Sequence, residues 1–499
     1  MLPVPRDDLQ PNQAGYETTP LVMAAGFREY DARWLYGTEI NLLGMRALGL
    51  GIGTLLREAG VRPEIVTGHD FRSYSMAIKD ALILGLMTAG CTVHDIGLAL
   101  SPTAYFAQFA LDVPAVAMVT ASHNDNGWTG VKIGIERPLT LGPLEMARLR
   151  DIVLKGEWIE SPGGALRHVP DMAGRYIADL VSGGRIGRRL KVIAACGNGT
   201  AGAFAPQVLE GIGCDVIRLD CDLDYRFPRY NPNPEDLAML HAMAEAVREH
   251  GADIAFGFDG DGDRCGVVDN EGQEIFADKI GVMLARDMSA AHPGARFVVD
   301  IKSTSLFASD PLLRANGAVT EYWKTGHSYM KRRTAETGAL AGFEKSGHYF
   351  FGTPYGRGYD DGLLSAIAIC RMLDRAPSRS MADLYRDLPR TWSTPTMSPH
   401  CPDGEKYGVI DRITRHFQDH MAAGGVLAGQ RITDLITING VRIVLEDGSW
   451  GLVRASSNKP ELVVVCESPV SEQAMQAVFR DIEAHLRSHG EIGAFNQTI

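Results

Sequence analysis

Short apolar runs alternate with longer amphipathic segments along most of the chain. The first series begins at residue 64, where EIVTGHD, CTVHDIG and PAVAMVT have the length and composition of buried strands. Between them, YSMAIKDALILGLMTAG and the stretch that opens at Ser101 and Pro102 carry apolar residues at helical spacing. This alternation of strands and helices predicts an α/β domain with a largely parallel sheet.

The same rhythm returns twice before the pattern changes. Strand-like runs LKVIAAC, CDVIRLD and ADIAFGFD lie within 190–259, and RFVVDIK, VTEYWK and ALAGFEK lie within 296–345. The C-terminal part instead offers a helix near EKYGVIDRITRHFQDHM, a hairpin-like VRIVLEDGSWGLVRAS, a strand ELVVVCE and a closing helix. We predict three consecutive α/β domains with mixed sheets and a C-terminal α+β domain, arranged around a central active-site cleft.

Gly-, Pro- and Ser-containing stretches mark the expected boundaries. We expect a flexible N-terminal extension over 1–20, a domain over 21–168, a second over 169–273, a third over 274–388 and the last over 389–499.

Composition excludes several classes of protein. The 499 residues carry a net charge of −12, which argues against non-specific binding to nucleic acid. The eight cysteines form no C-x-x-C pair, so neither a zinc site nor a disulfide framework is indicated. The N-terminus lacks the apolar segment of a signal peptide, and the sequence contains no run of about 18 apolar residues. We expect a cytoplasmic monomer or weak homo-oligomer that contacts no membrane.

The most informative loop is DGDGDR, which follows the strand-like run ADIAFGF. Asp259, Asp261 and Asp263 would repel one another without a cation between them, and hard oxygen ligands suit Mg²⁺ or Ca²⁺. An EF-hand would need Gly and Glu where this chain has Arg264 and Asn270. The alternative is a charged hairpin turn, since Asp-Gly is a turn signal. A divalent ion beside Arg264 favours phosphate chemistry.

A second polar loop, ASHNDNGWTGVKIG, follows the strand PAVAMVT. It supplies Ser122, His123 and Lys132 at the carboxyl end of a strand, where active-site loops of α/β sheets lie. A serine accepts a phosphoryl group when a base and cations are near it. The alternative is an ordinary polar turn.

A third segment, AGFEKSGHYFF, places Glu344, Ser346 and His348 at alternate positions. In one extended strand they would share a face, and a carboxylate beside a hydroxyl suits sugar hydroxyls. The alternative is a polar sheet edge.

The loop RASSNKPEL joins two predicted strands near the C-terminus and resembles a phosphate cradle, with an arginine fork among hydroxyl and amide groups. Its candidate ligands are Arg454, Ser456, Ser457 and Asn458, and the alternative is an ordinary Ser/Asn/Pro turn. Further candidate cations are Arg33, Lys302, Lys324 and His327, and the alternative for each is an ordinary solvated side chain.

One motif supports a different function. Residues 197–202 read GNGTAG after a strand, and Asp220 ends the next strand, which is the pattern of a dinucleotide-binding site. An NAD-dependent oxidoreductase is therefore an alternative, although Gly-rich turns also serve packing.

Together the other loops resemble those of the α-D-phosphohexomutase superfamily, and the chain is similar to its phosphomannomutase/phosphoglucomutase group over about residues 25–470. GFDGDGDR is similar to the metal loop of that family. TASHNDNG resembles its TASHNP phosphoserine loop, with Asp125 and Asn126 where proline is usual. FEKSGH resembles GEMSGH, with Phe343 in place of glycine and Lys345 in place of methionine. RASSNKP resembles RASNTxP, with Asn458 in place of threonine.

The resemblance implies reversible phosphoryl transfer between C1 and C6 of mannose or glucose phosphates through a phosphoserine enzyme and a 1,6-bisphosphate intermediate. Mg²⁺ would be held by Asp259, Asp261, Asp263 and a phosphate oxygen on Ser122. The implied catalytic residues are Ser122, His123, Lys132, Arg33 and Arg264, and the implied substrate-binding residues are Lys302, Lys324, His327, Glu344, Ser346, His348, Arg454, Ser456, Ser457 and Asn458.

Glucose or mannose 1,6-bisphosphate would act as activator and intermediate. Two further alternatives stay open: a phosphoglucosamine or N-acetylglucosamine-phosphate mutase, and a sugar-phosphate binder without turnover.

Overall fold

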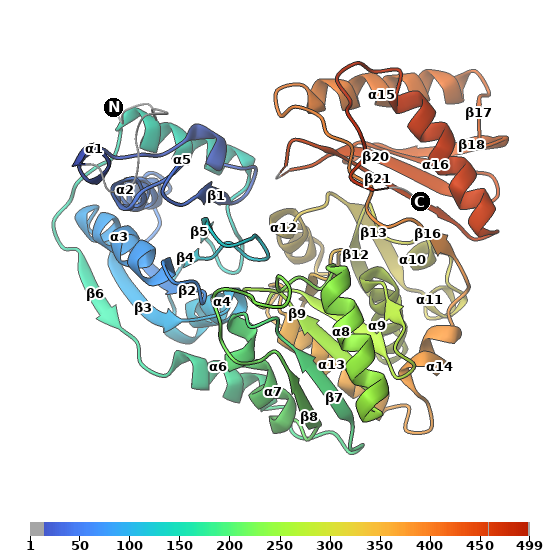
Figure 1. Cartoon of the computed structure of the whole chain (residues 1–499), viewed down its shortest axis with the longest axis horizontal. Helices are drawn as coiled ribbons and strands as arrows, with labels where there is room; N and C mark the ends of the chain where they lie inside the picture. Colours follow the sequence, from blue (N-terminus) through green and yellow to red (C-terminus); the bar gives the residue numbers. More distant parts are fainter. Residues whose placement is uncertain (1–13, 458, 498–499) are drawn as a thin grey trace. The chain divides into compact units, whose positions relative to one another are not determined.

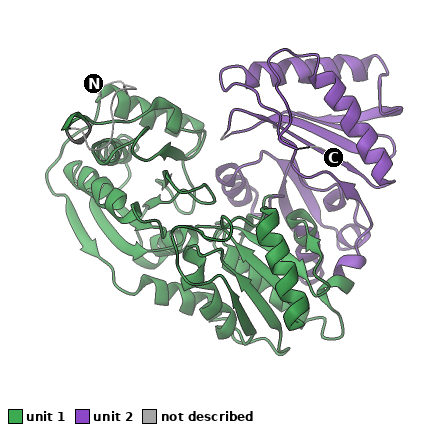
Figure 2. Ribbon diagram, in the orientation of Figure 1, with its two compact units in different colours: residues 1–280, 346–383 green, residues 281–345, 384–499 purple. Residues whose placement is uncertain are grey.

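The computed structural model describes residues 14–457 and 459–497 and divides into two compact units (Figure 2). The first unit combines residues 1–280 with residues 346–383, and the second combines residues 281–345 with residues 384–499. No helix within the described ranges has both the length and the apolar character needed to cross a membrane. Residues 1–13 of the expected extension lie outside the described residues, and Ala14–Thr18 form helix α1.

The first sheet belongs to the first unit and has the strand order β1-β5-β4-β2-β3-β6 (Figure 1). Its strands are β1 (Ala32–Leu35), β2 (Glu64–His69), β3 (Thr92–Leu98), β4 (Ala115–Val119), β5 (Trp128–Gly134) and β6 (Ala165–His168). Strands β4, β2, β3 and β6 are parallel to one another, whereas β5 and β1 are antiparallel to their neighbours. The central strands β2 and β4 are buried because helices cover both faces of such a sheet.

The helical segments of this region follow the expected alternation with the strands. They are η1 (Ala24–Gly26), α2 (Leu42–Glu58), α3 (Ser75–Thr88), α4 (Ser101–Leu111), α5 (Pro143–Lys155) and α6 (Met172–Val181). The α/β prediction is confirmed here.

The second sheet has the order β11-β10-β9-β7-β8, with β9 parallel to β7 and antiparallel to β10. Its strands are β7 (Lys191–Ala195), β8 (Asp215–Leu219), β9 (Ile254–Phe258), β10 (Cys265–Asp269) and β11 (Glu274–Ile275). The accompanying helical segments are η2 (Thr200–Ala203), α7 (Ala205–Gly211), α8 (Leu237–His250) and, after the chain returns to this unit, α13 (Gly362–Asp374) and α14 (Met381–Arg386). The aspartate loop joins β9 to β10.

The second unit contains a parallel group of strands and an antiparallel sheet. The parallel strands are β12 (Arg296–Asp300), β13 (Val319–Trp323) and β14 (Ala341–Phe343), with β12 between the other two. The helices of this part are α10 (Leu306–Ser309), α11 (Pro311–Ala315), α12 (His327–Thr337) and α9 (Ala277–Ala291), whose first turn belongs to the first unit.

The antiparallel sheet has the order β16-β21-β20-β19-β18-β17, and its core lies against α15 and α16. These elements are β16 (Trp392–Ser393), α15 (Lys406–Ala422), β17 (Val426–Leu427), β18 (Gln430–Ile436), β19 (Val441–Leu445), β20 (Trp450–Ala455), β21 (Leu462–Ser468) and α16 (Glu472–Leu486). The predicted C-terminal α+β domain is confirmed.

One local prediction is wrong. The segment AGFEKSGHYFF is not a single extended strand, because β14 ends at Phe343 and β15 (Tyr349–Phe351) begins after a turn. Gly347 has a φ of 95°, which only glycine adopts without strain, and it reverses the chain there. Glu344, Ser346 and His348 therefore do not share one face of a strand.

Four histidine rings gather where α15 and α16 lie side by side. His416 stacks on His485 with ring centroids 4.2 Å apart. The ring centroids of His416 and His420 are 5.8 Å apart, and those of His485 and His489 are 5.3 Å apart. Burial, together with the neighbouring imidazoles, lowers the pKa of His485 to about 4 and also lowers the pKa of His416. The packed arrangement therefore favours the neutral forms of His485 and His416.

This cluster predicts that acid weakens the C-terminal domain. The unfolded chain binds protons at a pKa near 6.5, whereas folded His485 resists them down to about 4, so stability falls as pH drops through that window. Halving the full effect for solvent screening leaves a loss of roughly 1–2 kcal/mol. Hydrogen exchange of α15 and α16 between pH 7 and pH 4.5 measures it. The variant His485→Gln should flatten the dependence, and His241→Gln on α8 should leave it unchanged.

Candidate active site

The three aspartates of the β9–β10 loop meet in the interior of the first unit. Asp259, Asp261 and Asp263 are all fully buried, and one carboxylate oxygen from each lies within 4.8 Å of the others. Gly262 has a φ of 72°, and a Cβ at Gly260 would lie 2.4 Å from the carbonyl oxygen of Ser122. The glycines between the aspartates thus allow both the tight loop and its approach to the serine loop.

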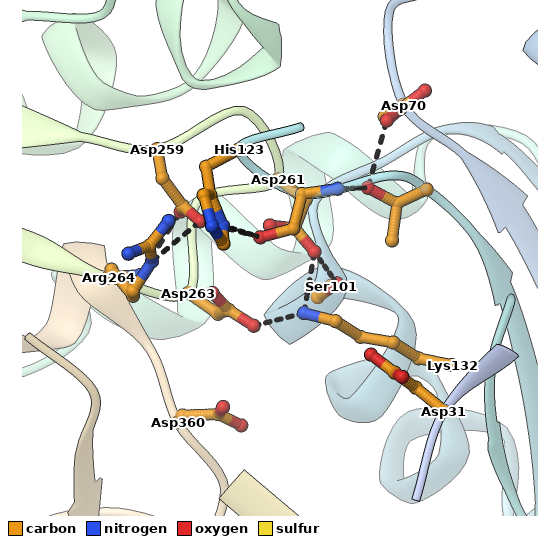
Figure 3. Close-up of polar contacts among 12 residues, drawn as sticks. Asp31, Asp70, Ser101, His123, Lys132, Asp259, Asp261, Asp263, Arg264 and Asp360 are labelled. Atoms are coloured by element: carbon orange, nitrogen blue, oxygen red, sulfur yellow. Dashed lines mark hydrogen bonds and ion pairs between the residues drawn. The ribbon is translucent and has the colours of Figure 1, made fainter. Parts of the chain in front are cut away.

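Lys132 projects from β5 between two of these carboxylates (Figure 3). Its Nζ donates to Asp261 Oδ2 at 2.6 Å and also to Asp263. Burial and the two carboxylates act in opposite directions on this ammonium, and the carboxylates prevail, so its pKa lies well above the usual value. Lys132 is therefore a protonated cation at neutral pH.

The site nevertheless contains more negative charge than its cations balance. Burial and the neighbouring Asp261 raise the pKa of Asp263 to about 7. A second cation among three buried carboxylates would relieve that repulsion, and a set of hard oxygen donors fits Mg²⁺. The residues present therefore fit the metal that the loop predicts.

Ser122 lies beside this acidic loop, just after β4 ends. Its Oγ donates to Asp259 Oδ2 at 3.0 Å and lies 3.3 Å from His123 Nδ1. The residue is 4% exposed and has a φ of 49°, a left-handed conformation that costs a serine about 1–3 kcal/mol. Such strain at a residue aimed into a polar site is typical of functional positions.

Two arginines border the same loops. Arg33 comes from β1, where its Nη1 donates to Asn124 Oδ1 at 2.6 Å and its Nε to Asp31 Oδ2 at 2.9 Å. Arg264 follows the third aspartate, and its Nε donates to Asp259 Oδ2 at 3.0 Å. The structure thus brings all five predicted catalytic residues, Ser122 among them, and the three aspartates of the predicted metal site together within one unit.

His348 reaches this site from the segment that returns to the first unit. Its Nδ1 lies 3.0 Å from Asp360 Oδ2 and 3.7 Å from Asp263 Oδ1. Sequence reasoning missed Asp360, and it also missed Ser101, whose Oγ donates to Asp261 Oδ2 at 2.5 Å. Each is remote in sequence from its partner and carries no motif that announces the contact.

Four predicted substrate-binding residues lie in the second unit around β12 to β14. Glu344 is 2% exposed, and its Oε1 accepts from the backbone N–H of Gly326 at 2.8 Å. That loop also carries Lys324 and His327, the latter as the first residue of α12. Lys302 follows β12, with its Nζ 3.8 Å from Asp300 Oδ2. One carboxylate and three possible cations therefore belong to neighbouring loops.

The predicted phosphate loop is in the same unit. Arg454 is the penultimate residue of the buried strand β20 and is 6% exposed. Ser456 Oγ accepts from the backbone N–H of Lys459 at 3.3 Å. Ser457 is partly buried next to it, whereas Asn458 lies outside the described residues. Ser346 belongs to the first unit, in the turn before His348.

The Gly-rich loop at 197–202 serves packing. A Cβ at Gly202 would lie 2.0 Å from the carbonyl oxygen of Cys221, and one at Gly197 would lie 2.9 Å from Pro232. The loop runs into the 3₁₀ segment η2, which begins at Thr200, and the seven-residue helix α7 follows. The Asp220 carboxylate accepts from Arg229 and Tyr230. These contacts explain the glycines and the acid without a dinucleotide, so the oxidoreductase alternative loses its support.

A serine hydroxyl held against an acidic metal loop, with Lys132 and two arginines around it, is the arrangement that phosphoryl transfer requires. Four consecutive stretches of the chain match one protein family. Residues 24–160, 175–272 and 276–392 match α/β/α domains I, II and III of phosphoglucomutase/phosphomannomutase, and residues 400–485 match the C-terminal domain.

Individual proteins agree with this match. A phosphomannomutase/phosphoglucomutase of Pseudomonas putida is 35% identical over 456 residues, covering 91% of this chain and 94% of the relative. A phosphoglucomutase of Neisseria meningitidis is 31% identical, covering 93% and 97%. The crystal structure of a phosphoglucomutase/phosphomannomutase family protein from Burkholderia thailandensis superposes with a TM-score of 0.83 at 29% identity, covering 94% and 98%. The chain therefore belongs to the phosphoglucomutase/phosphomannomutase family.

The acidic loop predicts a specific loss of metal affinity. Asp263→Asn removes one charge from the triad and should weaken Mn²⁺ binding, used as a probe for Mg²⁺, by at least about 10-fold, since a hydrogen-bonded or ligating charge is worth roughly 1.5–3 kcal/mol. Titration calorimetry measures the affinity. Asp80→Asn, on the exposed surface of the same unit, is the matched control. Equal affinity in both variants would remove Asp263 from the ligand set.

Proposed function

We propose that this protein transfers a phosphoryl group reversibly between O1 and O6 of mannose and glucose phosphates, with Ser122 as the carrier. The observation that carries the proposal is the 3.0 Å contact between Ser122 Oγ and Asp259, within a loop that meets the acidic triad. The mixed phosphomannomutase/phosphoglucomutase name of the Pseudomonas putida relative supports both sugars.

The reaction has two balanced transfers. In the first, the P–O bond to Ser122 Oγ breaks while phosphorus bonds to the free hydroxyl oxygen of a hexose 1-phosphate; that hydroxyl loses its proton and Ser122 Oγ gains one. The 1,6-bisphosphate that forms then returns its other phosphoryl group to Ser122 Oγ, which loses its proton, and the departing sugar oxygen gains one. Mg²⁺ bound by the three aspartates would supply positive charge to the phosphoryl oxygens during both transfers.

Residues of the first unit divide the charge and proton tasks. Lys132 is protonated, which suits stabilising phosphoryl oxygens and giving a proton to a departing oxygen. His348, whose Nδ1 lies 3.0 Å from Asp360 Oδ2, is proposed to accept the sugar hydroxyl proton. Arg33, His123 and Arg264 complete the surroundings of the serine loop and the acidic loop.

Residues of the second unit suit recognition of the sugar phosphate. The intermediate must react in two opposite orientations, and O3 and O4 of the hexose occupy nearly equivalent places in both. Glu344 is the buried carboxylate proposed to bind them, and Arg454, Ser456, Ser457 and Asn458 are proposed to hold the phosphate that is not reacting. Lys302, Lys324 and His327, together with Ser346 of the first unit, would add further contacts. Such a site reads little of C2, where glucose and mannose differ.

Several finer expectations belong to the same proposal. Glucose or mannose 1,6-bisphosphate would prime the serine and act as the intermediate. A monomer or weak homo-oligomer in a reducing, cytoplasmic setting suits the eight free cysteines. We also keep the domain boundaries 21–168, 169–273, 274–388 and 389–499 as a proposal.

The carrier assignment has a direct test. Ser122→Ala should abolish most turnover of glucose 1-phosphate because the acceptor oxygen is gone, while the Tm stays near that of the wild type. Phosphopeptide mapping after exposure to glucose 1,6-bisphosphate should find phosphate on Ser122 and on no other serine. Ser182→Ala, at the exposed end of α6, is the control. Phosphate on a different residue, or near-normal activity of Ser122→Ala, would overturn the assignment.

The sugar contact predicts equal losses on two substrates. Removing a hydrogen bond to a charged group costs about 1.5–3 kcal/mol, so Glu344→Ala should lower kcat/KM roughly 10- to 150-fold. Glucose and mannose share the stereochemistry of O3 and O4, and both should lose the same factor. Glu321→Ala removes a carboxylate of β13 that pairs with Arg333 and serves as the control. Loss confined to mannose would mean that Glu344 reads C2 instead.

A further inference from the structure

The Ser122 loop contains no proline between residues 120 and 127, yet it holds a strained conformation. Ser122 has a φ of 49°, in the left-handed region that favours glycine, and it does not relax to an ordinary value. A conformation of this kind persists only when surrounding contacts determine it. Arg72 supplies those contacts from the turn between β2 and α3.

Arg72 binds two carbonyl oxygens of the serine loop through one nitrogen. Its Nη2 donates to the carbonyl oxygen of Ser122 at 2.9 Å and to that of Asn124 at 2.7 Å. Its other terminal nitrogen, Nη1, contacts the Asp70 carboxylate. The Arg72 side chain is 1% exposed and that of Asp70 is 0% exposed. The buried guanidinium is thus neutralised by Asp70, and its Nη2 is hydrogen-bonded to the loop backbone.

Asp70 binds the first residues of the same loop, Thr120 and Ala121. Its Oδ2 accepts from Thr120 Oγ1 at 2.8 Å and from the backbone N–H of Ala121 at 3.2 Å. The Thr120 hydroxyl in turn accepts from the backbone N–H of Ser122 at 2.9 Å. Both the N–H and the C=O of the strained serine are therefore hydrogen-bonded within one buried network.

From these contacts, we propose that Arg72 is a positioning residue that, paired with Asp70, holds Ser122 in the conformation from which its Oγ reaches Asp259. The planar fork of arginine donates in several fixed directions, which a lysine ammonium does not reproduce. Its role differs from that of Arg33 and Lys132, because its charge is matched by Asp70 and its donors go to carbonyl oxygens. The catalytic part of this inference rests on the proposed mutase function.

The test uses Arg72→Lys and Arg72→Met in the full-length protein, with Lys79→Met as the matched control. Lys79 forms another buried ion pair in this domain, with Nζ 2.6 Å and 2.7 Å from the two oxygens of Asp95. A misplacement of about 1 Å at a reacting atom costs on the order of 10²-fold in rate. We therefore expect kcat for glucose 1-phosphate to fall roughly 10- to 100-fold in both Arg72 variants, with KM within about two-fold.

Hydrogen exchange gives a readout that does not depend on catalysis. The amides of Ala121 and Ser122 should exchange faster in the Arg72 variants and at the wild-type rate in Lys79→Met. Each protein is measured at the same interval below its own Tm, so that losses of global stability are matched. Lys79→Met should also keep the wild-type kcat. If Arg72→Met does not fold, Thr120→Val decides, since it removes only the hydroxyl that links Asp70 to Ser122 and should change kcat and exchange in the same direction.

Three results would overturn the inference. These are wild-type exchange of residues 121–122 in the Arg72 variants, a kcat loss no larger than that of Lys79→Met at matched stability, or an effect that appears in KM alone. Absence of mutase activity from the wild type would instead contradict the proposed function, and the exchange measurement would still decide whether Arg72 holds the loop.

Discussion

The confinement of three carboxylates in a buried loop is the constraint on which the rest of the first unit depends. Asp259, Asp261 and Asp263 have no exposed surface, and like charges at this separation are costly unless cations and donors surround them. Lys132 on β5 donates to Asp261, and Arg264 in the loop itself donates to Asp259. The raised pKa of Asp263 marks the charge that is still unbalanced, which a divalent ion would neutralise.

The same constraint explains why the serine loop must be held firmly. A nucleophilic oxygen beside a group of carboxylates is useful only at a defined position, because charge stabilisation depends steeply on distance. Burial of Arg72 and Asp70 costs solvation, and that cost is offset by hydrogen bonds on both sides of Ser122. Hydrogen bonding thereby replaces the stiffness that a proline would give to TASHNDNG.

The side chains proposed to recognise the substrate lie in the second unit. Here the side chains are spread over loops after β12, β13, β14 and β20, and Glu344 is fixed by a backbone N–H of a neighbouring loop. A carboxylate held by the backbone keeps its orientation whichever way the sugar is bound. This suits a reaction whose intermediate must be accepted in two orientations.

The chemistry of individual loops could be predicted from the sequence because the residues of each motif lie close together along the chain. The alternation of apolar runs was enough to predict three α/β domains and an α+β domain, and the spacing of Asp259, Asp261 and Asp263 was enough to predict a metal loop. The glycine signal at 197–202 misled in part, because the same residues that approach a dinucleotide also allow close packing against Pro232 and Cys221.

Tertiary structure alone decided which distant residues meet. The pairing of His348 with Asp360, of Ser101 with Asp261 and of Arg72 with the Ser122 carbonyl joins segments that no local pattern relates. The turn at Gly347 likewise separates Glu344 from His348, although their alternation had indicated one strand. The physical reason is that periodicity and motif spacing report on the nearest few residues, whereas buried polar groups find their partners only when the whole chain packs.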